Sequence, residues 1–259
     1  MSQASSRPPA LVTGASAGLG RVFAERFAAR GYDLLLVGRD AARLDAVSRE
    51  LAERFGVGVE PFAADLSRDD EVTRLVERIA ALPHLAVLVN NAGFGVRGML
   101  ATAPPEPQAA MLHLHTLAPM RLTRAALPGM IRCGSGAVIN VSSVASFIYA
   151  AGNVNYCATK AYLTVFSEGL ARELEGTGVT VQALCPGFTH TEFHQRMGFD
   201  KRDVPGWMWM DAKDVVDYSL ACLDRGGPVI CVPGARYRLI VALLRLVPRR
   251  WIGRFTGPR

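Results

Sequence analysis

Short apolar runs alternate along this chain with stretches of helical spacing, and this alternation limits the fold more than any other feature. The clearest runs, each long enough for one buried strand, are residues 10–12, 33–38, 136–141 and 179–184. Three further predicted strands are residues 57–62, 86–89 and 229–232. Strands that alternate with helices form parallel sheets with helices on both faces. We therefore predict an α/β protein with a doubly wound, seven-stranded parallel sheet.

Composition and length favour a globular protein built around one large core. The 259 residues are half apolar and one fifth charged, and no apolar run approaches the ~18 residues of a membrane-spanning helix. Five cysteines without Cys-x-x-Cys spacing fit reduced thiols, which indicates a cytoplasmic protein. We predict a folded domain over residues 10–234, a flexible N-terminus over 1–9 that is no signal peptide, and a basic, apolar, helical extension over 235–259.

A glycine-rich turn links the first predicted strand to the first predicted helix. The run is Thr13-Gly-Ala-Ser-Ala-Gly-Leu-Gly20, with glycines at 14, 18 and 20 that permit a tight turn. Backbone N–H groups at the N-terminus of such a helix bind phosphate, so the turn predicts a site for the pyrophosphate of a dinucleotide. The order strand, glycines, helix carries this prediction, since isolated glycine-rich turns are common.

The second predicted strand ends in a basic residue where NAD-selective sites carry an acidic one. Gly38 ends the strand and Arg39 follows it. A guanidinium holds a phosphate with two hydrogen bonds, so Arg39 favours NADP(H) over NAD(H) through the 2′-phosphate. The alternative is that Arg39 caps the next helix or lies in solvent.

Three polar side chains meet after the fifth predicted strand. Ser143 follows the strand, and Tyr156 and Lys160 lie four residues apart on one face of the next helix. Open α/β sheets bind ligands at this carboxyl end of their strands. A lysine cation lowers the pKa of a neighbouring phenol, normally near ~10. Tyr156 is therefore predicted to protonate a carbonyl oxygen as hydride arrives, while the Ser143 hydroxyl holds that oxygen.

In order and spacing these motifs resemble the short-chain dehydrogenase/reductase family over residues 10–232. The resemblance rests on the glycine-rich turn, Asn90-Asn-Ala-Gly93, Ser143 thirteen residues before Tyr156, Tyr156-x-x-x-Lys160, and Pro186-Gly187 with Thr191. It implies a single Rossmann-type domain, commonly a homodimer or homotetramer. In it Tyr156 would be the general acid/base, Lys160 would bond the nicotinamide ribose, and Ser143 would orient the substrate carbonyl. The cofactor-binding residues that it implies are Gly14, Ser16, Gly18, Leu19, Gly20, Arg39, Asp65, Asn91, Ala92, Gly93, Tyr156, Lys160, Pro186, Gly187, Thr189 and Thr191.

One position departs from the family pattern. The helix before the catalytic strand, predicted over residues 107–130, normally carries an asparagine that bends the helix and passes protons to the lysine through water. Here His115 occupies that place. We include His115 among the candidate catalytic residues, because an imidazole can bond a water or relay protons near neutral pH.

A turn-rich insertion over residues 188–211, which we call the flap, contains clustered aromatic and methionine side chains. They are Met197, Phe199, Trp207, Met208, Trp209 and Met210. Adjacent large side chains cannot all face one core, so some are expected to line an apolar substrate cleft. The alternative is a flap that simply packs on the body of the protein. No metal site is predicted: His190 and His194 lie four apart, but no glutamate directly follows His190.

The basic character of the chain is concentrated at its C-terminus. From Arg225 to the end there are eight arginines and no acidic residue, so the net charge of +6 becomes −2 without them. Apolar residues are interleaved at 239–244, 246, 247, 251 and 252. An anionic membrane surface, or an acyl-carrier or CoA partner, would suit this segment. The alternative is a final helix that covers the substrate cleft, and no nucleic-acid partner is indicated.

We therefore expect an NADPH-dependent carbonyl reductase that acts on an apolar, lipid-like or fatty-acyl ketone, with a role in lipid metabolism. A second hypothesis is an NADP(H)-sensing binding protein with little catalysis, which only the substitution at His115 supports. An epimerase or dehydratase would require a larger substrate domain than the residues after 232 provide, and an enoyl reductase spaces its tyrosine and lysine further apart.

Overall fold

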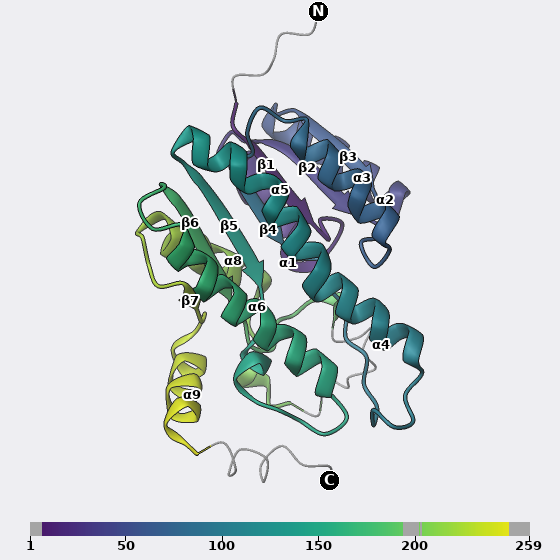
Figure 1. The fold of residues 1–259 in the computed structure, drawn as a ribbon, viewed down its shortest axis with the longest axis vertical. Helices are drawn as coiled ribbons and strands as arrows, with labels where there is room; N and C mark the ends of the chain where they lie inside the picture. Colours follow the sequence, from purple (N-terminus) through teal and green to yellow (C-terminus); the bar gives the residue numbers. More distant parts are fainter. Residues whose placement is uncertain (1–6, 194–201, 203, 249–259) are drawn as a thin grey trace, which may run out of the picture.

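The predicted parallel sheet is present in the computed structural model, which describes residues 7–193, 202 and 204–248 (Figure 1). Its seven strands lie in the order β3-β2-β1-β4-β5-β6-β7, and all six neighbouring pairs are parallel. The strands are β1 (Pro9–Thr13), β2 (Asp33–Gly38), β3 (Val59–Ala63), β4 (Val87–Asn90), β5 (Gly136–Val141), β6 (Val179–Leu184) and β7 (Ile230–Cys231). The strand order reverses between β1 and β4, which is where open sheets of this kind bind ligands.

Helices cover both faces of the sheet. The α-helices are α1 (Gly18–Ala29), α2 (Ala41–Phe55), α3 (Asp69–Ala80), α4 (Pro105–Leu112), α5 (Ala118–Cys133), α6 (Val154–Glu173), α8 (Ala212–Asp224) and α9 (Ala235–Leu246). Figure 1 shows α5 and α6 in front of the sheet and α1 and α8 behind it. Side chains of β1 alternate between two buried clusters, Ala10 and Val12 in one and Leu11 in the other, because successive strand residues point to opposite faces.

The helix predicted over residues 107–130 is interrupted where the sequence has His115. Between α4 and α5 the chain forms one π-helical turn, η1 (His113–Leu117). Pro119 lacks the N–H that an α-helix would donate to the carbonyl of His115, so the regular pattern cannot continue there. The N–H of Ala118 instead bonds the carbonyl of His113, five residues back. The apolar spacing hardly changes across this turn, so it predicts one continuous helix over residues 107–130.

The C-terminal extension is helical, as predicted, over α9 (Ala235–Leu246). Most of the predicted flexible N-terminus, together with His194, Met197, Phe199 and the segment 249–259, lies outside the described residues. Among the residues that the structure describes, no helix has both the length and the apolarity to cross a membrane.

Candidate functional site

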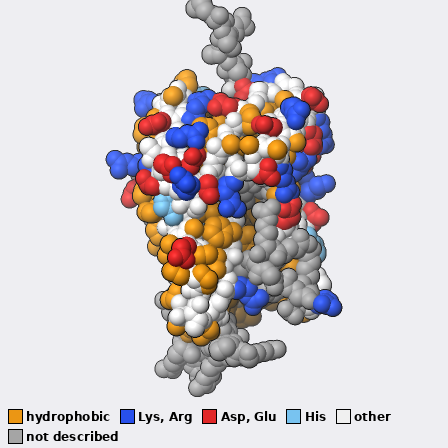
Figure 2. Space-filling model, turned by 90° about the vertical axis from the view of Figure 1, so that its right-hand side faces the viewer, with side chains coloured by type: hydrophobic (Ala, Val, Ile, Leu, Met, Phe, Trp, Pro, Cys, Tyr) orange, Lys and Arg blue, Asp and Glu red, His pale blue; other side chains and the backbone are white. Residues whose placement is uncertain are grey.

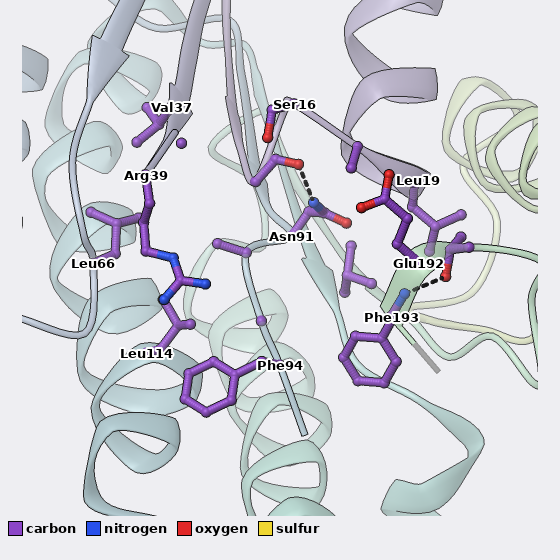
Figure 3. A pocket seen from close by; sticks show the side chains of 18 of the residues that line it. Ser16, Leu19, Val37, Arg39, Leu66, Asn91, Phe94, Leu114, Glu192 and Phe193 are labelled. Atoms are coloured by element: carbon purple, nitrogen blue, oxygen red, sulfur yellow. Dashed lines mark hydrogen bonds between the residues drawn. The ribbon is translucent and has the colours of Figure 1, made fainter. Parts of the chain in front are cut away.

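A cavity of about 610 Å³ opens at the carboxyl edge of the sheet and brings nearly all predicted site residues together (Figure 3). Two of them do not line it, Gly20 and His115. Those that do are Gly14, Ser16, Gly18, Leu19, Arg39, Asp65, Asn91, Ala92, Gly93, Ser143, Tyr156, Lys160, Pro186, Gly187, Thr189 and Thr191. Since these residues come from loops and helix starts scattered over the sequence, the parallel sheet is what assembles them.

The glycine-rich turn is held tightly against the first turn of α1. Gly14 and Gly18 have φ angles of +67° and +54°, which favour glycine. Gly20 has no such angle, but a Cβ there would lie 2.3 Å from the carbonyl oxygen of Gly14. The turn therefore leaves the cavity wall made of backbone, which a phosphate can approach closely.

A threonine at the end of β1 ties this turn to the Asn-Asn-Ala-Gly turn after β4. The Thr13 hydroxyl accepts hydrogen bonds from the N–H groups of Asn91 and Ala92, each at 2.9 Å, and donates to the carbonyl of Val89. The Asn91 side chain donates back to the Thr13 carbonyl at 2.8 Å. These bonds fix the floor of the cavity.

Ser143, Tyr156 and Lys160 form another part of the cavity wall. The Lys160 Nζ donates to the carbonyl of Val141 at 2.8 Å and lies 5.7 Å from the centre of the Tyr156 ring. The Ser143 hydroxyl is hydrogen-bonded to Tyr156 and also accepts from the N–H of Ala145. A phenol and a hydroxyl thus face one space, with a lysine behind the phenol.

The electrostatics of this wall differ from the sequence-based prediction. Burial raises the pKa of Tyr156 to about 12, although its hydrogen bond with Ser143 acts in the other direction. Burial also lowers the pKa of Lys160 to about 8. We expected the Lys160 cation, with an oxidised nicotinamide adding to it, to lower this pKa. Among the groups of the chain itself, burial of the phenol acts more strongly, in the opposite direction. At neutral pH Tyr156 is a protonated phenol, the form that can donate a proton.

His115 lies behind the cavity with both ring nitrogens engaged. Thr159 donates its hydroxyl proton to the Tyr156 carbonyl, so its oxygen accepts from the His115 Nδ1–H at 3.0 Å. The His115 Nε2 then accepts from the N–H of Phe94 at 3.2 Å. Burial, and then the charge of Lys160, hold the pKa of His115 well below its ordinary value. We propose that this neutral imidazole positions its neighbours rather than relaying protons, since neither nitrogen is available.

Two arginines border the far end of the cavity. Figure 3 shows the Arg39 side chain extending between Leu66 and Leu114. Arg39 is exposed and forms no ion pair with any residue in the described part of the chain, which leaves its guanidinium available to an anion. Of the two alternatives for Arg39, capping of α2 is wrong, because the side chain of Asp40 caps that helix, whereas exposure to solvent is what the structure has. Arg43 instead pairs with Glu192 from the flap.

The flap divides its large side chains between core and surface. Trp209 and Met210 are buried, whereas Trp207 is exposed. Its contribution to the cavity lining comes from other residues, namely Thr189, Thr191, Glu192 and Phe193. Among the expected tryptophans and methionines that the structure describes, Trp207, Met208, Trp209 and Met210, none is a lining residue. His190 stacks on Trp209, with ring centres 5.0 Å apart.

Sequence reasoning missed Tyr237 on α9, which anchors the flap. Its hydroxyl accepts from the N–H of Phe188 at 3.0 Å and donates to the carbonyl of Met208 at 2.6 Å. Its ring fills the space beside Gly187, where a Cβ would lie 1.9 Å from a ring carbon. The neighbouring Arg236 donates to the carbonyl of Trp209. The only sequence signal was Gly187 itself. A glycine permits a close approach by another side chain, but the sequence does not identify that side chain as Tyr237.

Comparisons with known proteins agree with this geometry. A family model described as short chain dehydrogenase matches residues 9–201. A short-chain dehydrogenase from Sphingobium yanoikuyae, solved in complex with NADPH, is 36% identical with a TM-score of 0.84, covering 92% of this chain and 94% of that one. A bulky-bulky ketone specific alcohol dehydrogenase from Comamonas testosteroni is 31% identical with a TM-score of 0.80, covering 93% of each chain. A very-long-chain 3-oxoacyl-CoA reductase from Bos taurus is 32% identical over 71% of this chain and 60% of its own.

Proposed function

Because the chain belongs to the short-chain dehydrogenase/reductase family, we propose that it reduces the carbonyl of an apolar ketone to an alcohol with hydride from NADPH. As a member it is an NAD(P)-dependent oxidoreductase. The observation that carries the proposal is that Ser143, Tyr156 and Lys160 line the same cavity as the glycine-rich turn.

The residues of the chain divide the work between binding and proton transfer. A bound reduced nicotinamide supplies the hydride, and its positively charged oxidised form favours the phenolate that remains after proton transfer. Tyr156 gives its hydroxyl proton to the carbonyl oxygen, while the Ser143 hydroxyl donates a hydrogen bond to that oxygen. Lys160, buried beneath them, would bond the ribose. Asp65, whose carboxylate accepts from the N–H and hydroxyl of Ser67, would border the adenine.

An apolar substrate is supported by the side chains around Tyr156. Phe193 lies 5.9 Å from the Tyr156 ring, centre to centre, and Phe94, which packs on His115, also lines the cavity. An aliphatic or aromatic substituent buried between such rings is stabilised by the area it removes from water. Two of the relatives carry names for a bulky ketone and a long acyl chain, which favours a lipid-like substrate and a role in lipid metabolism here.

NADPH consumption with a panel of ketones tests this function. The panel is graded by chain length and by headgroup, and we expect turnover to increase with apolar length because of the aromatic lining. Tight NADPH binding without consumption on any ketone would instead favour the second hypothesis, an NADP(H) sensor. Turnover confined to short, polar ketones would contradict the substrate class but leave the reductase standing.

A preference for NADPH over NADH is supported by Arg39 and tested by Arg39→Asp. Loss of a charge-assisted phosphate contact costs about 1.5–3 kcal/mol, so we expect the Kd of NADPH to rise by roughly ten- to a hundredfold, while that of NADH changes little. Arg124→Asp, an equal change of charge at an exposed position of α5, is the control. Parallel fluorescence titrations with both coenzymes give the ratio, and an unchanged ratio would remove the reason for choosing NADPH.

We infer the cellular compartment of the protein from its cysteines, and its assembly from its exposed apolar residues. All five cysteines are unpaired, and four are buried, which suits the reducing cytoplasm.

On the face in Figure 2, charged side chains cover the upper half and hydrophobic ones gather below. The exposed apolar residues of α4, η1, α5 and α6 include Leu112, Leu117, Ile131 and Val165. A homodimer or homotetramer that covers them is the assembly we propose.

A further inference from the structure

The C-terminal helix α9 is apolar on two opposite faces. Its inner face contains Tyr237 and Val241, both buried in the body of the protein. Its outer face carries Leu239, Leu243 and Leu246, which are 62%, 53% and 81% exposed. These three lie at i, i+4 and i+7, so they form one stripe along the helix. A stripe of leucines is costly in water, and the inner face already supplies the packing that holds the helix.

Positive charge accompanies the stripe. Arg238 and Arg245 on α9 are exposed, and their contacts are to aromatic side chains, the hydroxyl of Tyr218 and the ring of Phe147. Neither contact neutralises the guanidinium. The sequence that follows α9 adds four more arginines and no acidic residue. Anionic lipid headgroups complement this positive charge. A protein partner would need an acidic face to do the same.

Contacts of α9 with the flap and with the turn after Ser143 place this helix near the substrate end of the cavity. Tyr237 and Arg236 hold the flap, as described above, and Arg245 lies 5.3 Å over the Phe147 ring in η2 (Val144–Phe147), which begins directly after Ser143. In Figure 1, α9 projects from the lower end of the molecule, beyond β7. A surface that receives the leucines therefore also lies near the flap.

From these observations we propose that α9 docks the protein on an anionic lipid surface, with its leucine stripe in the headgroup region and its arginines against the lipid charges. Such a helix lies in the interface rather than across the bilayer. The proposal concerns binding to lipid and does not rest on the proposed ketone reduction. If the protein does not bind lipid, the proposed reductase activity is not affected.

Sedimentation with sucrose-loaded vesicles tests the docking with the full-length protein. We expect partition onto phosphatidylcholine vesicles that contain phosphatidylglycerol, weak partition onto phosphatidylcholine alone, and release at high salt. The triple variant Leu239→Gln, Leu243→Gln, Leu246→Gln keeps helix-forming side chains but removes the stripe. It should partition at least about tenfold less strongly, because three apolar side chains no longer enter the interface.

A matched variant and two further measurements make the result decisive. Met99→Gln, Leu100→Gln changes two exposed apolar residues that lie outside both α9 and the proposed subunit interface, and should partition as the wild type does. An unchanged NADPH Kd in the stripe variant shows that it is folded. Equal partition of wild type and stripe variant would overturn the proposal. So would a stripe variant whose mass by light scattering falls, which makes the stripe a subunit interface, or an absence of vesicle binding with saturable binding to an acyl-carrier protein.

Discussion

Replacing Tyr156 with phenylalanine is expected to lower turnover by about 10³-fold or more, because the change removes the only proton that the proposed mechanism delivers to the carbonyl oxygen. The ring remains and continues to pack against Phe193 and His115, so the cavity keeps its shape. The Kd of NADPH should therefore change by less than about threefold. Single-turnover kinetics together with fluorescence titration separate the two effects. Tyr162→Phe is the control, since it removes a hydroxyl from an exposed ring on the same helix.

The pKa of Tyr156 gives the same prediction a pH dependence. Since burial raises this pKa to about 12, the phenol is protonated throughout the neutral range. Ketone reduction uses the protonated form and should be nearly independent of pH there. Alcohol oxidation uses the phenolate, whose population rises by up to about tenfold per pH unit below the pKa. We expect oxidation by the wild type to increase from about pH 7 to about pH 9, with no such increase in Tyr156→Phe. A flat oxidation profile would mean that another group accepts the proton.

The fold could be predicted because hydrophobic spacing alone decides most of it. The strands over 33–38, 136–141 and 179–184 have the predicted bounds, since each is a buried apolar run that ends in polar or glycine residues. The π turn at η1 could not be predicted in this way. It depends on the missing N–H of Pro119 and on the packing of His115, neither of which alters the apolar spacing.

The same distinction applies to the candidate site: residues placed by local sequence could be predicted, whereas residues placed by long-range contacts could not. Residues that follow strand ends were identified, because the sheet brings all such loops to one edge. Tyr237 and the pair of Arg43 with Glu192 were not, since 49 residues separate Tyr237 from Phe188 and 149 separate Arg43 from Glu192. Burial was the other omission. The sequence places a cation near Tyr156, but only the structure shows that Lys160 is buried and that Tyr156 is partly buried.

The contact between the glycine-rich turn and α1 carries the second large effect that we expect. Gly20 has an ordinary helical conformation, so alanine would suit its backbone and even favour the helix by about 1 kcal/mol. The obstacle to alanine at position 20 is the lack of space for its Cβ. Its Cβ would lie 2.3 Å from the Gly14 carbonyl oxygen and 2.5 Å from the Asn91 side-chain nitrogen. Both atoms belong to the cavity floor, and neither is the free end of a flexible side chain, since Asn91 is held by Thr13.

Gly20→Ala is therefore expected to displace the turn, to lower the free energy of unfolding by about 1–3 kcal/mol, and to raise the Kd of NADPH by at least about tenfold. Urea unfolding and coenzyme titration measure the two quantities. Gly169→Ala is the matched control: it makes the same substitution in the helix α6, with open space around the new methyl group, and should stabilise the protein by about 0.5–1 kcal/mol. If Gly20→Ala binds NADPH as tightly as Gly169→Ala does, the turn does not hold the pyrophosphate, and the cofactor must lie elsewhere in the cavity.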